Sequence, residues 1–356
     1  MHTINIEQVQ AMVEHVAVGL DEPVGILGQF GGGKTAGIEQ AVERNGWHMC
    51  KVLLGQYDSV DLKGTPWDGD IGDGFRATVW RPASTLPFEG NPNFPKDKII
   101  ILFLDEITSA TIPVMGICYQ LTNERRIGEH KLMDNVRIVL AGNREVDKGI
   151  VNRMPMPLNN RITWAEAGLD VDTWCNWALQ NKIDPVFVAF LQFRKPLICT
   201  FDPAKPDKCV ATPRTIEKAA RYYAATTMPE DIRQAAMAGA VGDGWAAEFW
   251  GFVKVWHQIA GLMPSILKDP EKAKLPEETS MQYAVAVAIS GEMTPKTTPI
   301  YHKYLTRMPP EFVVLAWQLA VKRDVKPGTT SAKDSPLFKT QEFLDVAKRY
   351  KAVFAD

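Results

Sequence analysis

The residues best suited to chemistry lie near the start of the chain, in the sequence GQFGGGKT. They fit the spacing G-x-x-x-x-G-K-[ST] and are Gly28, Gln29, Phe30, Gly31, Gly32, Gly33, Lys34 and Thr35, followed by Ala36. Glycines let backbone N–H groups turn inward around an anion, and the first turn of a following helix adds positive potential. The spacing therefore predicts a phosphate-binding loop in which Lys34 reaches the outer phosphates and the Thr35 hydroxyl binds Mg²⁺. A plain glycine-rich turn is the alternative.

A second candidate is the acidic pair that ends the apolar stretch IIILFL, Ile99–Leu104. Asp105 at the end of a strand can bind Mg²⁺ or its water shell, and Glu106 can polarise an attacking water. Taken alone, such a pair more often caps the next helix. Together with the glycine loop it indicates a nucleoside triphosphatase.

These residues need an α/β framework to bring them together. Apolar stretches at Val24–Leu27, His48–Leu54, Ile99–Leu104 and Val136–Ala141 predict strands, with helical stretches between them. A strand that is apolar on both faces is typical of a central parallel strand. We therefore expect a layered α/β domain to about Thr163, and only helices after about Ala165. The aromatic stripe Trp245, Phe249, Phe252 and Trp256 has helical spacing and predicts core positions.

Composition limits the class of protein. The chain has 356 residues, 46% hydrophobic and 23% charged, with a formal net charge of −2. This balance suits a two-domain globular protein and carries no overall basic charge for nucleic acid, although a local patch could be hidden in it. No stretch predicts a signal peptide or a membrane span, and the five cysteines are scattered without a Cys-x-x-Cys pair. We expect a cytoplasmic protein.

Several further motifs make the first 230 or so residues resemble the AAA+ ATPases, and within them the MoxR-like branch. AGNREVD follows a predicted strand, MPMPLNNRITW resembles the box that ends in an arginine finger, and ATPRTIEKAARYYA resembles the start of a lid helix. DLKGTPW and ERRIGEHKL resemble the stretch before the branch's insertion and the hairpin before the first sensor strand. Phe30-Gly31 departs from the Pro-Gly of many relatives, but the backbone role survives.

The resemblance implies a role for three more residues. Asn143 would be the first sensor, Arg161 the finger that reaches a neighbouring subunit, and Arg214 the second sensor. From the residues alone, Asn143 could simply form a turn, and Arg153 competes with Arg161 for the finger. Arg214 would lie in the first turn of a helix, where an arginine is unfavourable unless an anion or solvent compensates it.

The resemblance also implies an architecture and an assembly. The fold class would be α/β, a P-loop NTPase (AAA+) core with a parallel sheet, followed by an α-helical lid and further C-terminal helices. We expect the core over 1–165 with an insertion around 63–90, the lid over 166–230 and a helical extension over 231–356. The cofactors would be ATP and Mg²⁺, and the assembly a homo-oligomeric ring, most often a hexamer.

What the ring acts on is left open by the sequence. The first hypothesis is a chaperone-like motor for a protein partner, which in this branch often carries a von Willebrand factor A-type domain. The second is a nucleic-acid motor or clamp-loader-like switch, and the third is a scaffold with slow turnover. Support for the second would come from the short basic clusters Arg125, Arg126 and Lys131, and Lys348, Arg349 and Lys351. Trp67, Phe75 and Trp80 could contact a partner or be buried locally.

Overall fold

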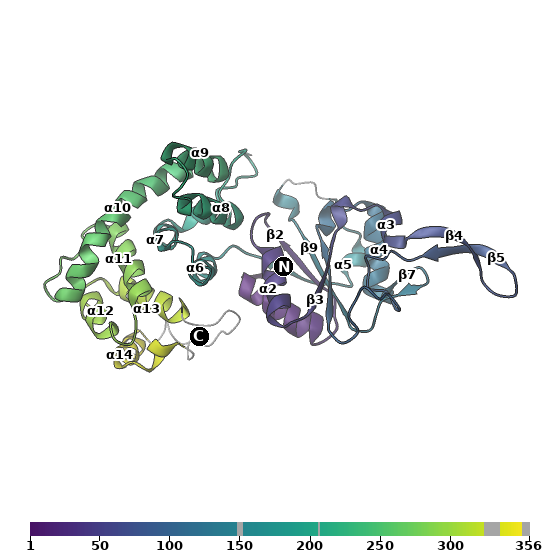
Figure 1. Ribbon diagram of the computed structural model, residues 1–356, viewed down its shortest axis with the longest axis horizontal. Coiled ribbons are helices and arrows are strands. Elements are labelled where there is room, and N and C mark those ends of the chain that lie inside the picture. Colours follow the sequence, from purple (N-terminus) through teal and green to yellow (C-terminus); the bar gives the residue numbers. More distant parts are fainter. Residues whose placement is uncertain (148–151, 206, 324–334, 351–356) are drawn as a thin grey trace. The chain divides into compact units, whose positions relative to one another are not determined.

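The computed structural model describes residues 1–147, 152–205, 207–323 and 335–350 (Figure 1). The chain forms two compact units, Met1–Leu169 and Asp170–Asp356. Each unit has its own hydrophobic core, and each is described by itself below.

The first unit is built on a parallel sheet of six strands in the order β1-β10-β2-β9-β6-β3. Their bounds are β1 Thr3–Ile4, β2 Val24–Gly28, β3 His48–Leu53, β6 Ile100–Asp105, β9 Val136–Gly142 and β10 Thr163–Ala167. Every residue of β6 is buried, as expected for an inner strand covered on both faces. The prediction of an α/β fold with a parallel sheet is confirmed.

Helices cover both faces of this sheet. Ile101 and Phe103 of β6 pack on one side, with helices α1 and α2, whereas Leu102 and Leu104 pack on the other, with α4. This alternation follows from the two-residue period of a strand. The helical segments are α1 Ile6–Met12, the π-helical η1 Val13–Val18, α2 Lys34–Arg44, η2 Leu54–Gln56, α3 Ser59–Lys63, η3 Ile107–Ser109, α4 Ile112–Glu124, η4 Glu145–Asp147 and α5 Met156–Asn159.

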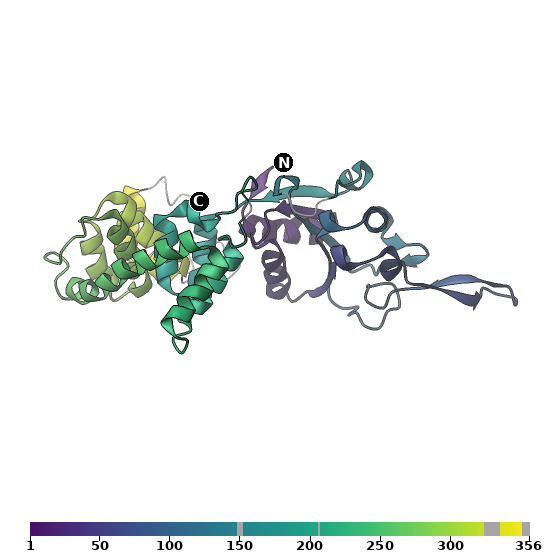
Figure 2. The same ribbon diagram turned by 90° about the horizontal axis from the view of Figure 1, so that it is seen from above.

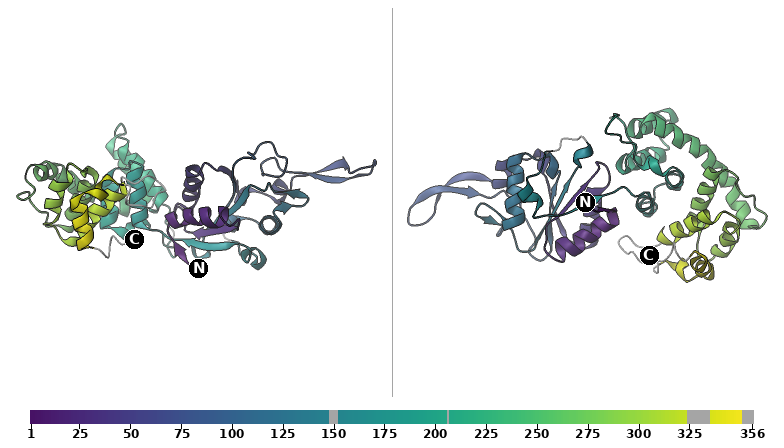
Figure 3. Two further views of the ribbon diagram at one scale, coloured as in Figure 1. Left: turned by 90° about the horizontal axis from the view of Figure 1, so that it is seen from below. Right: turned by 180° about the vertical axis from the view of Figure 1, so that it is seen from behind.

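Two antiparallel hairpins complete the first unit. The expected insertion contains β4 Thr65–Asp70 and β5 Arg76–Arg81, which extend away from the sheet in all views (Figures 2 and 3). The expected hairpin in ERRIGEHKL consists of β7 Arg126–Ile127 and β8 His130–Lys131. Its presence confirms that prediction.

The described part of the second unit consists of helices. They are α6 Val171–Gln180, α7 Pro185–Phe193, η5 Lys195–Ile198, α8 Pro213–Ala224, α9 Glu230–Val241, α10 Asp243–Lys268, α11 Thr279–Glu292, α12 Thr298–Leu305, α13 Pro310–Arg323, η7 Pro336–Lys339 and α14 Gln341–Arg349. One hydrophobic cluster runs through them from Trp174 to Val346. Trp245, Phe249 and Phe252 are buried in it, as predicted, and Trp256 is partly buried against it.

Two strands of the sheet, β1 and β10, were not predicted from the sequence. β10 ends at Ala167, close to the expected limit of the strands near Ala165, and pairs with both β1 and β2. The fourth residue of its sequence TWAEA is Glu166, which interrupts the apolar pattern expected of a buried strand. Among the described residues, no helix is long and apolar enough to cross a membrane.

Candidate functional site

The glycine loop joins β2 to α2 at the carboxyl edge of the sheet. Gly31 and Gly33 have φ values of 69° and 92°, a backbone region that side chains with a Cβ rarely adopt. Gly33 is also the N-cap of α2 and has no side chain with which to cap that helix end. The first amides of a helix lack intrahelical acceptors, so an uncapped end preceded by such a loop is suited to an anion.

Lys34 is held inside this loop. Its side chain is mostly buried, at 8% residue exposure, and its Nζ donates to the carbonyl oxygens of Gly28 at 2.6 Å and Gln29 at 2.9 Å. Nζ also lies 3.3 Å from Oδ1 of Asn143, at the end of β9. The predicted loop lysine and the predicted sensor therefore meet, although they are far apart in the sequence.

Thr35 and Asp105 form a second contact across the same edge. The Thr35 hydroxyl donates to Asp105 Oδ2 at 3.1 Å, and the Glu106 amide donates to Asp105 Oδ1 at 3.0 Å. Asp105 is 7% exposed, so its carboxylate is held in one orientation. A hydroxyl and a carboxylate oxygen side by side are hard oxygen ligands of the kind that Mg²⁺ prefers.

Glu106 occupies an unusual backbone conformation. Its φ of 56° and ψ of 37° are left-handed, and its side chain is exposed, unlike that of the neighbouring Asp105. Such a conformation is uncommon outside glycine, and strained residues are concentrated at functional sites. Asp105 is therefore buried at the edge of the sheet, whereas the exposed Glu106 side chain places Oε2 beside Gly55, where an added Cβ would lie 3.3 Å from it.

Asn143 is positioned by a threonine that the sequence did not single out. The Asn143 amide donates to Oγ1 of Thr108, a buried residue on η3, at 2.9 Å. A Cβ at Gly142 would lie 2.8 Å from Thr108 Cγ2, so glycine permits this close approach. Thr108 therefore fixes the end of β9, and with it the amide side chain that contacts Lys34.

Arg144 ties the same turn to the neighbouring strand. Its guanidinium contacts Asp147 at 2.8 Å and Glu166 of β10 at 2.9 Å. The hydrogen bond to Asp147, followed by that to Glu166, raises the pKa of Arg144 above its ordinary value, against the opposing effect of burial. The glutamate that obscured β10 in the sequence is thus one partner of an ion-pair network beside the site.

Arg161 is held on the surface of the first unit. Its guanidinium lies 4.5 Å from the centre of the Tyr119 ring, Nε donates to Asn123 Oδ1 at 2.7 Å, and Nη1 donates to the Pro157 carbonyl at 3.1 Å. Arg153, the competing candidate, is exposed. The described contacts place Arg161 against α4 and α5, and none of them joins Arg161 to Lys34 or Asp105 of the same chain.

Arg214 belongs to the second unit. It follows Pro213 in the first turn of α8, where Thr212 is the N-cap and accepts from the Thr215 amide. The Arg214 side chain is exposed. The expected position in the first turn of a helix is therefore observed, and its sensor role stays a prediction.

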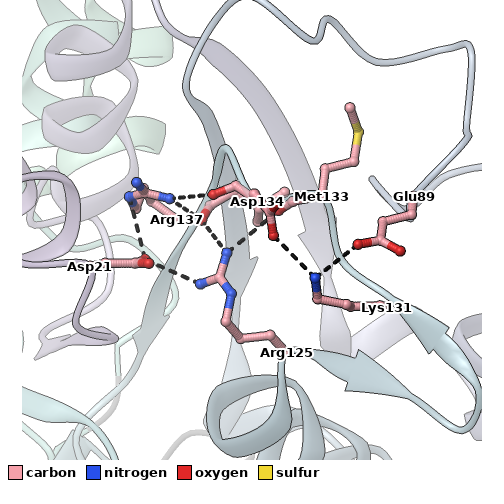
Figure 4. A network of polar contacts seen from close by, with 8 residues as sticks. Asp21, Glu89, Arg125, Lys131, Met133, Asp134 and Arg137 are labelled. Carbon is pink, nitrogen blue, oxygen red and sulfur yellow. Dashed lines mark hydrogen bonds and ion pairs between the residues drawn. The ribbon is translucent and has the colours of Figure 1, made fainter.

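The basic cluster of the β7–β8 hairpin is surrounded by carboxylates (Figure 4). Arg125 contacts Asp21 at 3.1 Å, and Lys131 contacts Glu89 at 2.9 Å and Asp134 at 3.2 Å. The hydrogen bond to Glu89 is the largest of the effects that raise the pKa of Lys131. These cations are already paired within the chain, which reduces their attraction for a phosphate backbone.

The remaining basic residues add little to that cluster. Arg126 donates to the Gly128 carbonyl at 2.7 Å, inside its own hairpin turn. Lys348 and Arg349 are exposed at the end of α14, and Lys351 lies outside the described residues.

The residues at the carboxyl edge fit a nucleotide with a divalent cation. The fit rests on the uncapped end of α2, the Lys34 ammonium, and the adjoining oxygens of Thr35 and Asp105. Within the described ranges, no group of three or more His, Cys, Asp or Glu side chains could hold a metal ion. Mg²⁺ characteristically takes one or two protein oxygens and completes its shell with phosphates and water.

Comparisons with known proteins identify similar solved structures only. No family model matches the chain, and no curated protein matches it significantly. NtrX from Brucella abortus with ATP is 13% identical, with 98% of this chain and 67% of that chain covered and a TM-score of 0.40. The RuvB Holliday junction branch migration motor of Thermotoga maritima is 13% identical, with 85% and 86% covered and a TM-score of 0.36. A putative ATPase from Cytophaga hutchinsonii is 11% identical, with 88% and 79% covered and a TM-score of 0.33. At these scores we base the function on the site's own geometry.

Proposed function

We propose that this chain is a Mg²⁺-dependent ATPase of the AAA+ class, of the MoxR-like branch. The observation that carries the proposal is the convergence at one sheet edge of the loop after β2, the end of β6 and the end of β9. There Thr35 contacts Asp105 at 3.1 Å and Lys34 contacts Asn143 at 3.3 Å. The edge at the carboxyl ends of parallel strands is where α/β proteins bind ligands.

Each residue has a distinct task in this proposal. The amides of Gly31–Ala36 and the Lys34 ammonium hold the phosphates, and Thr35 and Asp105 hold the cation. Bound there, Mg²⁺ would neutralise charge on the β and γ phosphates. Glu106 accepts a proton from the attacking water, and Asn143 orients that water.

We further propose that hydrolysis takes place in the cytoplasm, in a homo-oligomeric ring, which in this family is most often a hexamer. Arg161 would complete a neighbouring subunit's site, and stacking on Tyr119 already limits the orientations of its side chain. A trans arginine can raise turnover by about three to five decades. Residues 166–230 would act as the lid carrying Arg214, and residues 231–356 as an extension.

The partner in this proposal is a protein, such as one with a von Willebrand factor A-type domain. Support comes from the β4–β5 hairpin, where Trp67, Phe75 and Trp80 are 53%, 66% and 41% exposed. Trp67 pairs with Val79 and Trp80 with Pro66, so the two indoles lie on opposite faces of the ribbon, and the hairpin would offer a partner apolar side chains on both faces. The paired cations of the β7–β8 hairpin do not favour the nucleic-acid alternative.

The test is the dependence of ATP hydrolysis on protein concentration, with and without DNA. We expect specific activity to rise steeply with concentration as rings form, and to be the same with single- or double-stranded DNA. Stimulation by DNA would favour the nucleic-acid motor. Tight ATP binding with negligible turnover at every concentration would favour the slow scaffold.

A further inference from the structure

One cation beside the proposed metal ligands has no role in the account so far. Lys51 lies on β3, the edge strand, and its register partner on β6 is Phe103. Because strand side chains alternate, Lys51, Phe103 and Asp105 share one face of the sheet. The Lys51 ammonium lies 5.8 Å from the Phe103 ring centre and 3.8 Å from Asp105 Oδ2.

Lys51 has a second acidic partner. Its Nζ donates to Oε1 of Glu39 on α2 at 2.9 Å, and the Glu39 side chain is about half exposed. The Lys51 side chain is itself 32% exposed, so it keeps freedom to move. The ammonium therefore stands between a buried carboxylate, Asp105, and a solvated one, Glu39.

Asp105 does not need Lys51 for its orientation. Its two carboxylate oxygens accept from the Glu106 amide and the Thr35 hydroxyl, at 3.0 and 3.1 Å. What Lys51 adds is a positive charge close to Oδ2, the oxygen that Thr35 also contacts. At 3.8 Å from an oxygen of a buried carboxylate, one unit charge affects the binding of another cation there.

We propose that Lys51 is a specificity residue that makes cation binding at Thr35 and Asp105 depend on nucleotide. The inference rests on the proposed function and assigns a further residue to that same site. Without nucleotide, the Lys51 charge opposes a divalent cation at Asp105 Oδ2. With nucleotide, the phosphate charges outweigh this repulsion, and the ammonium moves fully to Glu39. Metal and nucleotide would then bind together rather than metal first.

A purely structural role makes a different prediction. If Lys51 only links β3 to α2 through Glu39, its loss would lower thermal stability without changing metal affinity. The electrostatic role predicts the reverse, because exposed ion pairs contribute little to stability.

The experiment measures Mn²⁺ binding by electron paramagnetic resonance, with Mn²⁺ as the probe for Mg²⁺. We expect Lys51→Met to tighten nucleotide-free Mn²⁺ binding about tenfold or more, and Lys51→Arg to behave as the unmodified protein. In the presence of ADP, the Mn²⁺ affinities of all three should agree within about threefold. Lys63→Met, on α3, is the matched control, and Lys51→Gln replaces Lys51→Met should the latter not fold.

The double variant Lys51→Met with Asp105→Asn locates the effect. We expect it to lose the gain in Mn²⁺ affinity, since the gain requires the Asp105 carboxylate. Equal nucleotide-free affinities in Lys51→Met and the unmodified protein would overturn the role of Lys51 while ADP binding stays intact. Failure of the unmodified protein to bind ADP would instead overturn the proposed function itself.

Discussion

The carboxyl edge of the sheet buries charged side chains, whereas the β4–β5 hairpin exposes aromatic ones. At the edge, the charged residues Lys34 and Asp105 are only 8% and 7% exposed, and each contacts a residue distant in the sequence. On the hairpin, the apolar residues Trp67 and Phe75 are 53% and 66% exposed. Burying charge and exposing aromatic rings both oppose folding preferences. The contrast is consistent with the proposed ATP site at the edge and the proposed surface for a protein partner on the hairpin.

The hairpin is held together by contacts of its own, and among its described hydrogen bonds only those of the Trp80 backbone reach the β7–β8 hairpin, at Glu129 and His130. Arg76 Nε donates to both carboxylate oxygens of Asp68, at 3.1 and 3.0 Å, and the Arg81 guanidinium lies 3.8 Å from the Trp67 ring centre. Exposed ion pairs add little stability, and isolated two-stranded hairpins are marginal in water. Substitutions on the surface of the hairpin should therefore change the free energy of unfolding of the unit little, whereas substitutions at the edge should change it more.

The largest expected effect comes from Lys34→Ala, at the buried side of the comparison. ATP binding, and with it all turnover, should be lost, because Lys34 supplies charge-assisted hydrogen bonds to the phosphates and each hydrogen bond to a charged group contributes about 1.5–3 kcal/mol. Fluorescence titration with a labelled ATP analogue measures this. Lys63→Ala is the control, and retained ATP affinity in Lys34→Ala would refute the loop assignment.

Arg161→Ala should have the next largest effect. We expect turnover to fall by about three to five decades with nucleotide binding retained, since the guanidinium acts on a neighbouring site. Mixing Arg161→Ala with Glu106→Gln subunits should restore part of the activity at interfaces that carry both intact groups. The absence of rescue at every mixing ratio would count against a trans role, and Arg153→Ala tests the competing finger.

Glu106→Gln should distinguish ATP binding from ATP hydrolysis at the carboxyl edge of the sheet. Turnover should fall by about two to four decades, the usual contribution of a general base, while ATP stays bound and the ring is stabilised. Single-turnover hydrolysis and analytical ultracentrifugation measure the two effects. Glu145→Gln, at an exposed acid on η4, serves as control, and normal hydrolysis in Glu106→Gln would exclude Glu106 as the base.

The smallest effect on the isolated protein is expected for the hairpin variants Trp67→Ser and Phe75→Ser. ATP hydrolysis should change by less than about twofold and the free energy of unfolding by about 0.5 kcal/mol or less, as for surface substitutions. A photo-crosslinker at position 75 should capture a protein partner in an ATP-dependent way. A large loss of stability in these variants would show that the aromatic rings are structural and would remove the contrast.

Motifs with fixed spacing could be recognised in the sequence, whereas the strand register and the contacts between distant segments could not. The glycine loop, the acidic pair and the four apolar strands lie where expected, because local pattern and local structure agree there. β1 is only two residues long, too short for a recognisable pattern. In β10 the polar Glu166 interrupts the apolar pattern, and its partner Arg144 lies on a distant segment that the local sequence does not reveal. Strand register, which places Lys51 beside Asp105, has no local signal at all.

Thr108 illustrates the same limit within the site. It reads as an ordinary polar residue after an acidic pair, and its importance follows only from the close approach of Gly142 and the amide of Asn143. The left-handed backbone of Glu106 likewise depends on how β6 meets η3 and could not be deduced from residue type.

The most direct test of the proposed ATP site is a crystal structure with Mg²⁺ and a non-hydrolysable ATP analogue. We expect phosphate oxygens within hydrogen-bond distance of the amides of Gly31–Ala36, with the metal bound to Thr35 Oγ1 and to Asp105, either directly or through water. A nucleotide bound elsewhere, or a metal without contact to either residue, would contradict it.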